Sequence, residues 1–168
     1  APRISVTVNG GMVMPAWFDI RALDGDRNED PEGIEKSSGQ IRALIEREHD
    51  RGVPSERIVL AGFSQGAAMA LFTGLRHAAP LAGILALSGY LPLHESLPAE
   101  ASEANKQVEI LQAHGQHDDV VPYQVGHGSV ELLRAAGYGV EWHEYAMAHQ
   151  VCPEEVQEIG RWLARVLG

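Results

Sequence analysis

The sequence has one cysteine, Cys152, so it cannot form an internal disulfide, and nothing in it calls for an oxidising compartment. It also has no apolar run long enough to span a bilayer and no signal-peptide pattern at its start, which makes a cytoplasmic location the default expectation and gives no sign of stable membrane insertion. Basic residues are scarce: 13 Lys and Arg face 23 Asp and Glu, for a formal net charge of -10. That charge disfavours nucleic acid and anionic membranes as partners, because both bind basic surfaces.

The chain has 168 residues, 45% of which are hydrophobic. This length and composition suffice for one compact domain over residues 1–168. Its pattern predicts a small hairpin over residues 5–14 around an Asn-Gly turn, a loop over 24–31 and then alternating helices and strands. The predicted strands cover 58–63, 81–88, 108–113 and 139–145. The predicted helices cover 31–50, the stretch directly after Ser64, 123–136 and 153–167. This alternation is typical of an α/β domain with a mostly parallel sheet and helices on both faces.

The stretch around Ser64 is the most informative. An apolar run predicts a fully buried strand over residues 58–63, and small apolar residues after it predict a buried helix. Between them, Gly62-Phe63-Ser64-Gln65-Gly66 matches the G-x-S-x-G pattern of a nucleophile on a strained strand-to-helix turn. In that turn, both glycines are expected to let the neighbouring backbone pass, and the Gln65 amide is expected to donate to an oxyanion. Ser64 is therefore the candidate nucleophile.

A serine hydroxyl needs a base, and the base needs a carboxylate that orients it. His149 is favoured as the base because it lies in the loop after the last predicted strand. His143 is the nearest rival, but it lies inside that strand and is expected to pack against the sheet. Asp118 is the favoured carboxylate, with Asp119 as the alternative. The resulting order Ser, Asp, His is the chain order of the α/β-hydrolases.

Two other chemistries fit the sequence less well. A metal site could be assembled from residues of the 114–127 region, but no metal-binding spacing supports it, and neither a metal nor a cofactor is expected. The four residues in question are His114, His117, Asp118 and His127. A cysteine nucleophile fails on position, because Cys152 follows the last predicted strand.

Five segments together carry a resemblance to the phospholipase/carboxylesterase family, which includes acyl-protein thioesterases and small carboxylesterases. They occur in the family's order, and the G-F-S-Q-G and H-G-x-x-D elements are the specific ones. The segments are 14–20, 57–66, 86–92, 114–122 and 145–149. The resemblance implies an α/β-hydrolase fold with Ser64 as nucleophile, Asp118 as acid and His149 as base. It also implies that a homodimer can form and that lysophospholipid, ester and thioester substrates are all open.

The resemblance departs at the start of the chain. The family begins with a further strand and a His-Gly-Leu-Gly loop that supplies an oxyanion donor, and neither is found in this sequence. We therefore expect this sequence to be an N-terminally incomplete part of a longer chain. The alternative is a catalytically inactive, hydrolase-fold binding protein.

The substrate is expected to be a small-molecule or lipid-like acyl ester. Large apolar residues near the expected site are candidates for an acyl groove, and ordinary packing is the alternative for each. The candidates are Met12, Met14, Trp17, Phe18 and Leu91.

Overall fold

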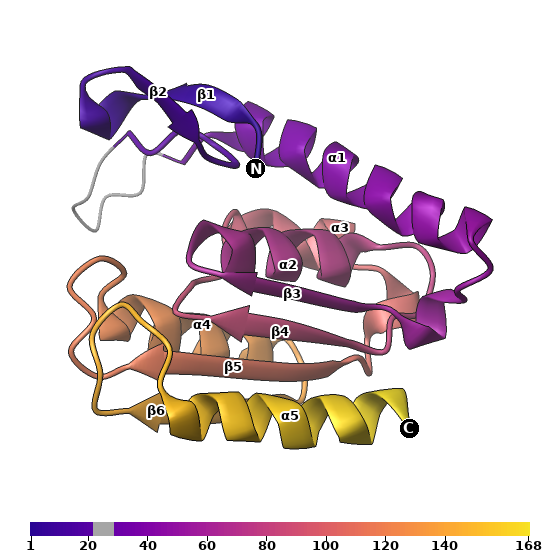
Figure 1. Ribbon diagram of the computed structural model, residues 1–168. Coiled ribbons are helices and arrows are strands. Elements are labelled where there is room, and N and C mark those ends of the chain that lie inside the picture. The colour runs from indigo at the N-terminus through magenta and orange to yellow at the C-terminus, as the bar shows by residue number, and fades with distance from the viewer. Residues whose placement is uncertain (22–28) are drawn as a thin grey trace.

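The computed structural model describes residues 1–21 and 29–168 (Figure 1). The loop expected over 24–31 lies mostly outside these residues. No helix in the described part of the chain has both the length and the apolar character needed to cross a bilayer.

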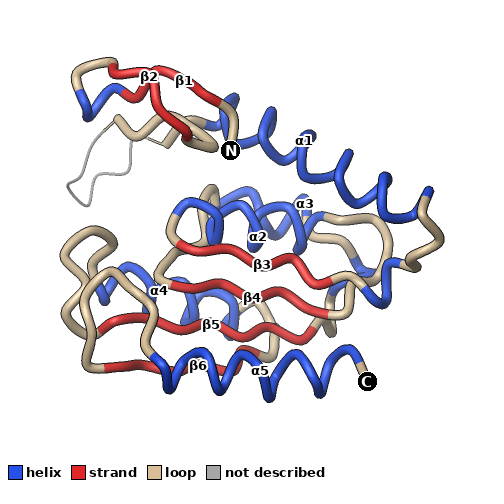
Figure 2. The backbone as a smooth tube through the Cα atoms, viewed as in Figure 1, coloured by secondary structure: helices blue, strands red, loops and turns tan. Residues whose placement is uncertain are grey.

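The centre of the molecule is a four-stranded parallel sheet in the order β3-β4-β5-β6 (Figures 1 and 2). The strands are β3 (Val59–Phe63), β4 (Gly83–Leu87), β5 (Glu109–Gly115) and β6 (Val140–Tyr145). All four strands were predicted, but the prediction that β3 is fully buried is wrong. Every residue of β4 is buried, whereas Ala61 and Phe63 of β3 are exposed. The reason is position: β3 forms one edge of the sheet, so its apolar run has a partner strand on one side only.

Helices cover both faces of this sheet, as the alternation predicted. The side chains of a strand point alternately to its two faces, so neighbouring residues enter different cores. Ile84 and Ile110 pack in the core that contains α2 (Gln65–Arg76) and α4 (Tyr123–Ala135). Leu85 and Leu111 pack instead around Trp162 of α5 (Pro153–Leu167). Because both faces are covered, β4 and β5 can be apolar along most of their length.

The N-terminal part packs outside these layers (Figure 1). β1 (Arg3–Val6) and β2 (Met12–Pro15) form the predicted antiparallel hairpin, and Gly10 and Gly11 adopt positive φ angles at its turn. α1 (Pro31–Asp50) matches the predicted helix and starts with the Asp30 carboxylate accepting from the Gly33 N–H at 3.2 Å. It packs on α2 through Ile34.

Leu44 of α1 is 53% exposed. The segment between β4 and β5 contains the short helix α3 (Leu97–Glu100) and two 3₁₀ turns.

Trp162 should dominate the core between the sheet and α5. Its side chain is fully buried, and a Cβ at Gly83 would come within 2.5 Å of its ring, so β4 passes directly against it. We expect Trp162→Ala to lower the free energy of unfolding by about 3–5 kcal/mol, because it removes a large apolar contact and leaves a cavity. Urea denaturation measures this change. The matched control is Val156→Ala in the same helix. Val156 is 57% exposed, so this substitution should change the free energy of unfolding by less than about 0.5 kcal/mol. Equal losses in both variants would contradict this assignment of the core.

Candidate active site

Ser64 occupies a strained turn between β3 and α2. Its φ of 56° and ψ of -121° lie in a region that non-glycine residues rarely adopt, at a cost of about 1–3 kcal/mol. A Cβ at Gly62 would lie 2.1 Å from the Gly66 carbonyl carbon, so glycine is required there. At Gly66, in contrast, a Cβ would meet nothing closer than the Trp17 Nε1 atom at 3.9 Å. The prediction that both glycines are needed for space is therefore wrong for Gly66.

Hydrogen bonds beyond the strand ends align the loops that carry polar residues. The Ser64 N–H donates to the Leu87 carbonyl at 2.9 Å, and the Ser88 N–H donates to the Ala113 carbonyl at 2.8 Å. On the other side of β5, the Gln116 N–H donates to the Tyr145 carbonyl at 2.8 Å. The ladder thus continues past the carboxyl ends of the strands, which is where parallel α/β sheets gather their functional groups.

The structure brings Asp118 and His149 into contact. The His149 Nδ1 atom lies 2.7 Å from the Asp118 Oδ2 atom, and because a carboxylate only accepts, Nδ1 carries the proton. The other oxygen, Oδ1, accepts from the backbone N–H groups of Val120 and Val121 at 2.9 and 2.8 Å. The Asp118 side chain is fully buried and the His149 side chain is 15% exposed. This bonding orients the imidazole and leaves its Nε2 atom free to accept a proton.

Packing on Phe63 places His149 beside the strained turn, and a close backbone contact places its loop against the end of β5. Its ring lies 4.6 Å from the Phe63 ring, centroid to centroid, and Phe63 directly precedes Ser64. The loop before His149 passes so close to Gly115 that a Cβ there would lie 2.4 Å from the carbonyl oxygens of Met147 and Ala148. A glycine at the end of β5 therefore allows the segment before His149 to approach residues 116–122, which are called the Asp118 loop below.

His114 also contributes to the Asp118 loop, which the sequence did not predict. It is fully buried, and its Nε2–H donates to the Val121 carbonyl at 2.8 Å, with the Asp118 Oδ2 atom 3.4 Å away. Gly126 makes room for the ring, since a Cβ there would come within 2.3 Å of Nδ1. Burial lowers the pKa of His114 below its ordinary 6.5, although the Val121 carbonyl and the Asp118 charge act in the opposite direction. A buried histidine inside an apolar strand was the available signal.

The rival residues lie elsewhere. Asp119 is exposed, and His143 lies on β6 against Glu141, its Nε2 atom 3.0 Å from the Glu141 Oε1 atom. Of the residues considered for a metal site in the 114–127 region, His114 and Asp118 are neighbours, whereas His117 is exposed. Cys152 occupies the N-cap position of α5, without a capping hydrogen bond from its side chain, and the strained turn is occupied by Ser64.

The Gln65 side chain has a role that the sequence did not reveal. Its Oε1 atom accepts from the Trp17 N–H at 2.9 Å, and its Nε2 atom donates to the Phe18 carbonyl at 3.0 Å. The Ser37 hydroxyl donates to the Trp17 carbonyl from α1. The side chain that follows the nucleophile candidate therefore holds the 17–18 segment next to the start of α2.

The groove candidates separate into two groups. Met14 and Trp17 line a cavity of about 740 Å³ that includes Ser64 and Gln65 and extends along β3 between the hairpin and α1. Phe18 and Leu91 are 2% and 1% exposed, belong to the core clusters and do not line this cavity. Met12 is 64% exposed on the hairpin. Met14 and Trp17 are thus the groove candidates that lie beside Ser64.

Comparison with known proteins agrees with this arrangement. The family model described as phospholipase/carboxylesterase matches residues 1–167. The chain belongs to the phospholipase/carboxylesterase family. This phospholipase/carboxylesterase chain is 45% identical to acyl-protein thioesterase 1 of Gibberella zeae and of Neurospora crassa, covering 99% of itself and 74% and 71% of those proteins.

Solved structures of similar proteins support the same fold. The crystal structure of Arabidopsis thaliana SOBER1 has a TM-score of 0.94 at 30% identity, with 100% of this chain and 81% of that chain covered. Zea mays acyl-protein thioesterase 2 has a TM-score of 0.88 at 32% identity, with 100% and 79% covered. The chain is therefore a hydrolase with the α/β-hydrolase fold of its family.

The two glycines of the Ser64 turn should respond differently to alanine. Gly62→Ala places a methyl group 2.1 Å from the Gly66 backbone, so we expect a loss of several kcal/mol in unfolding free energy and a loss of esterase activity. Gly66→Ala has space and lies in the first turn of α2, so we expect unchanged stability or a gain of up to about 1 kcal/mol. Chemical denaturation of both variants checks this. A Gly66→Ala variant as unstable as Gly62→Ala would contradict the geometry.

Burial of neutral His114 should make stability depend on pH. Because its pKa is lower in the folded protein, the unfolded chain takes up a proton there first as the pH falls below about 6.5, and the free energy of unfolding decreases. His114→Gln keeps a donor for the Val121 carbonyl but has no such proton. The stability advantage of the parent over this variant should therefore shrink between about pH 8 and pH 5. Denaturation series of both proteins over this range measure the difference, and an advantage that grows toward acidic pH would contradict the assignment.

Proposed function

We propose that this protein hydrolyses carboxylic esters or thioesters of acyl chains, with Ser64 as nucleophile, His149 as general base and Asp118 as the carboxylate that orients His149. The observation that carries the proposal is the 2.7 Å hydrogen bond from His149 Nδ1 to Asp118 Oδ2, made by a ring that packs on Phe63. It supports a base with the correct tautomer next to a serine held in a strained turn.

In the proposed reaction, the Ser64 Oγ attacks the substrate carbonyl while His149 Nε2 takes the hydroxyl proton. The Asp118 carboxylate stabilises the imidazolium that forms. The tetrahedral intermediate then expels an alcohol or a thiol, which leaves with the proton from His149. Water, deprotonated by His149, attacks the acyl-enzyme and releases the carboxylic acid and free Ser64.

The negative charge on the tetrahedral intermediate would rest at the start of α2. Gln65 is the first residue of that helix, and the first N–H groups of a helix have no acceptor within it. The positive end of the helix dipole favours an anion at the same place. We therefore propose the Gln65 backbone N–H as an oxyanion donor, while its side chain holds the 17–18 segment.

Acyl chains are the proposed substrate class because the surfaces next to Ser64 are apolar. Met14 and Trp17 would contact the part of the chain nearest the carbonyl. Relatives that are 45% identical are named acyl-protein thioesterase 1, which favours S-acylated peptides among the possible substrates.

A paired substitution separates Asp118 from its neighbour. Asp118→Asn should lower kcat by about 10⁴-fold, because an amide no longer enforces the tautomer of His149. Asp119→Asn is the matched control: it changes the adjacent, exposed carboxylate and should keep kcat within a few-fold of the parent. Hydrolysis of p-nitrophenyl butyrate and of an S-acylated cysteine peptide measures both. Equal losses in the two variants would contradict the role of Asp118.

Covalent labelling tests the nucleophile independently of turnover. A fluorophosphonate should modify the parent at Ser64, as peptide mass spectrometry can localise, and should leave Ser64→Ala unmodified. Labelling of the parent at another residue, or ester hydrolysis by Ser64→Ala at the parental rate, would overturn the proposed mechanism.

A further inference from the structure

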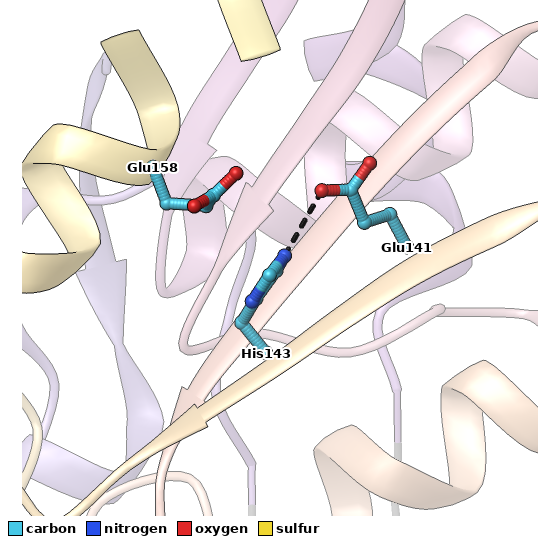
Figure 3. Close-up of side chains that lie close together, drawn as sticks. All are labelled: Glu141, His143 and Glu158. Carbon is cyan, nitrogen blue, oxygen red and sulfur yellow. Dashed lines mark hydrogen bonds and ion pairs between the residues drawn. The ribbon is translucent and has the colours of Figure 1, made fainter. Parts of the chain in front are cut away.

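Three potential metal ligands converge at the opposite edge of the sheet from β3. Glu141 and His143 are two residues apart on β6, so their side chains leave the same face of the strand. Glu158 reaches them from α5 (Figure 3). One ligand atom from each side chain lies within 4.8 Å of the other two, and in the described part of the chain this is the group that meets that criterion.

Each of the two carboxylates contacts an arginine through one of its two oxygens. Arg165 Nη2 lies 2.5 Å from Glu141 Oε2, while Glu141 Oε1 faces His143 Nε2 at 3.0 Å. Arg161 contacts Glu158 through Oε2 alone, with its Nε atom at 3.0 Å. In metal sites, ligating carboxylates are commonly oriented by such outer hydrogen bonds. The second oxygen of each glutamate lies outside its arginine contact.

We propose that Glu141, His143 and Glu158 form a binding site for a divalent transition metal ion, with zinc as the reference ion. One imidazole nitrogen and two carboxylate oxygens suit zinc, whereas magnesium and calcium prefer oxygen ligands alone. His143 would bind through the Nε2 lone pair with its proton on Nδ1, and water would complete a tetrahedral shell.

The geometry requires only side-chain adjustment. Around tetrahedral zinc, ligand atoms are about 3.4 Å apart. The present separations extend from 3.0 Å for the Glu141–His143 pair to at most 4.8 Å within the group. The side chains of Glu141 and His143 are 31% exposed and that of Glu158 is 19% exposed, so they have room to move and the ion has access from solvent.

The position gives the ion a structural role that does not depend on the proposed hydrolysis. β6 and α5 flank the 146–152 segment that carries His149. An ion shared by the two elements would tie together both ends of that segment. The two arginines offset the charge of the two glutamates, so the donor geometry, more than the net charge, would select the ion.

Calorimetric titration of the EDTA-treated, desalted protein with zinc chloride tests the site. We expect saturable binding of one equivalent and a higher unfolding temperature in its presence. His143→Gln and Glu158→Gln should each weaken binding by about tenfold or more. Titration with Co²⁺ should give visible absorption bands that His143→Gln alters. The far-ultraviolet circular dichroism of the metal-free variants should match the parent, which distinguishes ligand loss from misfolding.

Two further variants make the test specific. His127→Gln is the matched control, because His127 and Glu131 form a similar pair on α4, 3.8 Å apart, outside this cluster, and binding should be unchanged. His149→Gln should also keep the binding. The proposal is overturned by the absence of saturable binding, or by folded His143→Gln and Glu158→Gln variants that bind zinc as tightly as the parent does. A loss of binding in His149→Gln would also overturn it, because that result would place the ion at the active site.

Discussion

The parallel register of the sheet is the constraint on which the rest of the structure depends. Each strand from β3 to β6 pairs in the same direction with its neighbour, and backbone hydrogen bonds at Ser64, Ser88 and Gln116 continue the ladder beyond the strands. Asp118 and His149, which are 31 positions apart in the chain, therefore both lie at the carboxyl ends of the strands, where they form a hydrogen bond. A shift of one register step would turn the side chains of a strand to the opposite face of the sheet and would displace the loops that carry Asp118 and His149.

The close packing around this edge depends on residues without side chains. Gly62 lets β3 approach the start of α2, Gly115 lets the 146–148 loop cross β5, and Gly126 leaves space for the His114 ring. Strain at Ser64 is sustained because α2 and the ladder fix both sides of the turn. Stability elsewhere, including the Trp162 core, therefore supports a local conformation that is unfavourable by itself.

Much of the fold could be predicted from the sequence, because the spacing of apolar residues and the signals for helix ends depend only on residues close together in the chain. The central strands and α1, α4 and α5 were predicted within about two residues. Asp118 and His149 were predicted from their places after strands, and the structure brings them into contact. The edge position of β3 was missed, because an apolar run has the same appearance whether one or both sides are paired. Phe18 and Leu91 were candidates for the groove, with packing as the alternative, and they lie in the core. Hydrophobicity alone does not distinguish a groove residue from a core residue.

The sequence by itself determined the order of elements, the strained serine turn and the chemical types at the loop ends, because these depend on neighbouring residues. Only the tertiary structure decided which of those groups meet. It gave the Gln65 side-chain amide its partners at Trp17 and Phe18, and it placed His114 under the Asp118 loop. It also gathered Glu141, His143 and Glu158. Such contacts join residues distant in sequence, and they depend on strand register and helix placement, which no local pattern encodes.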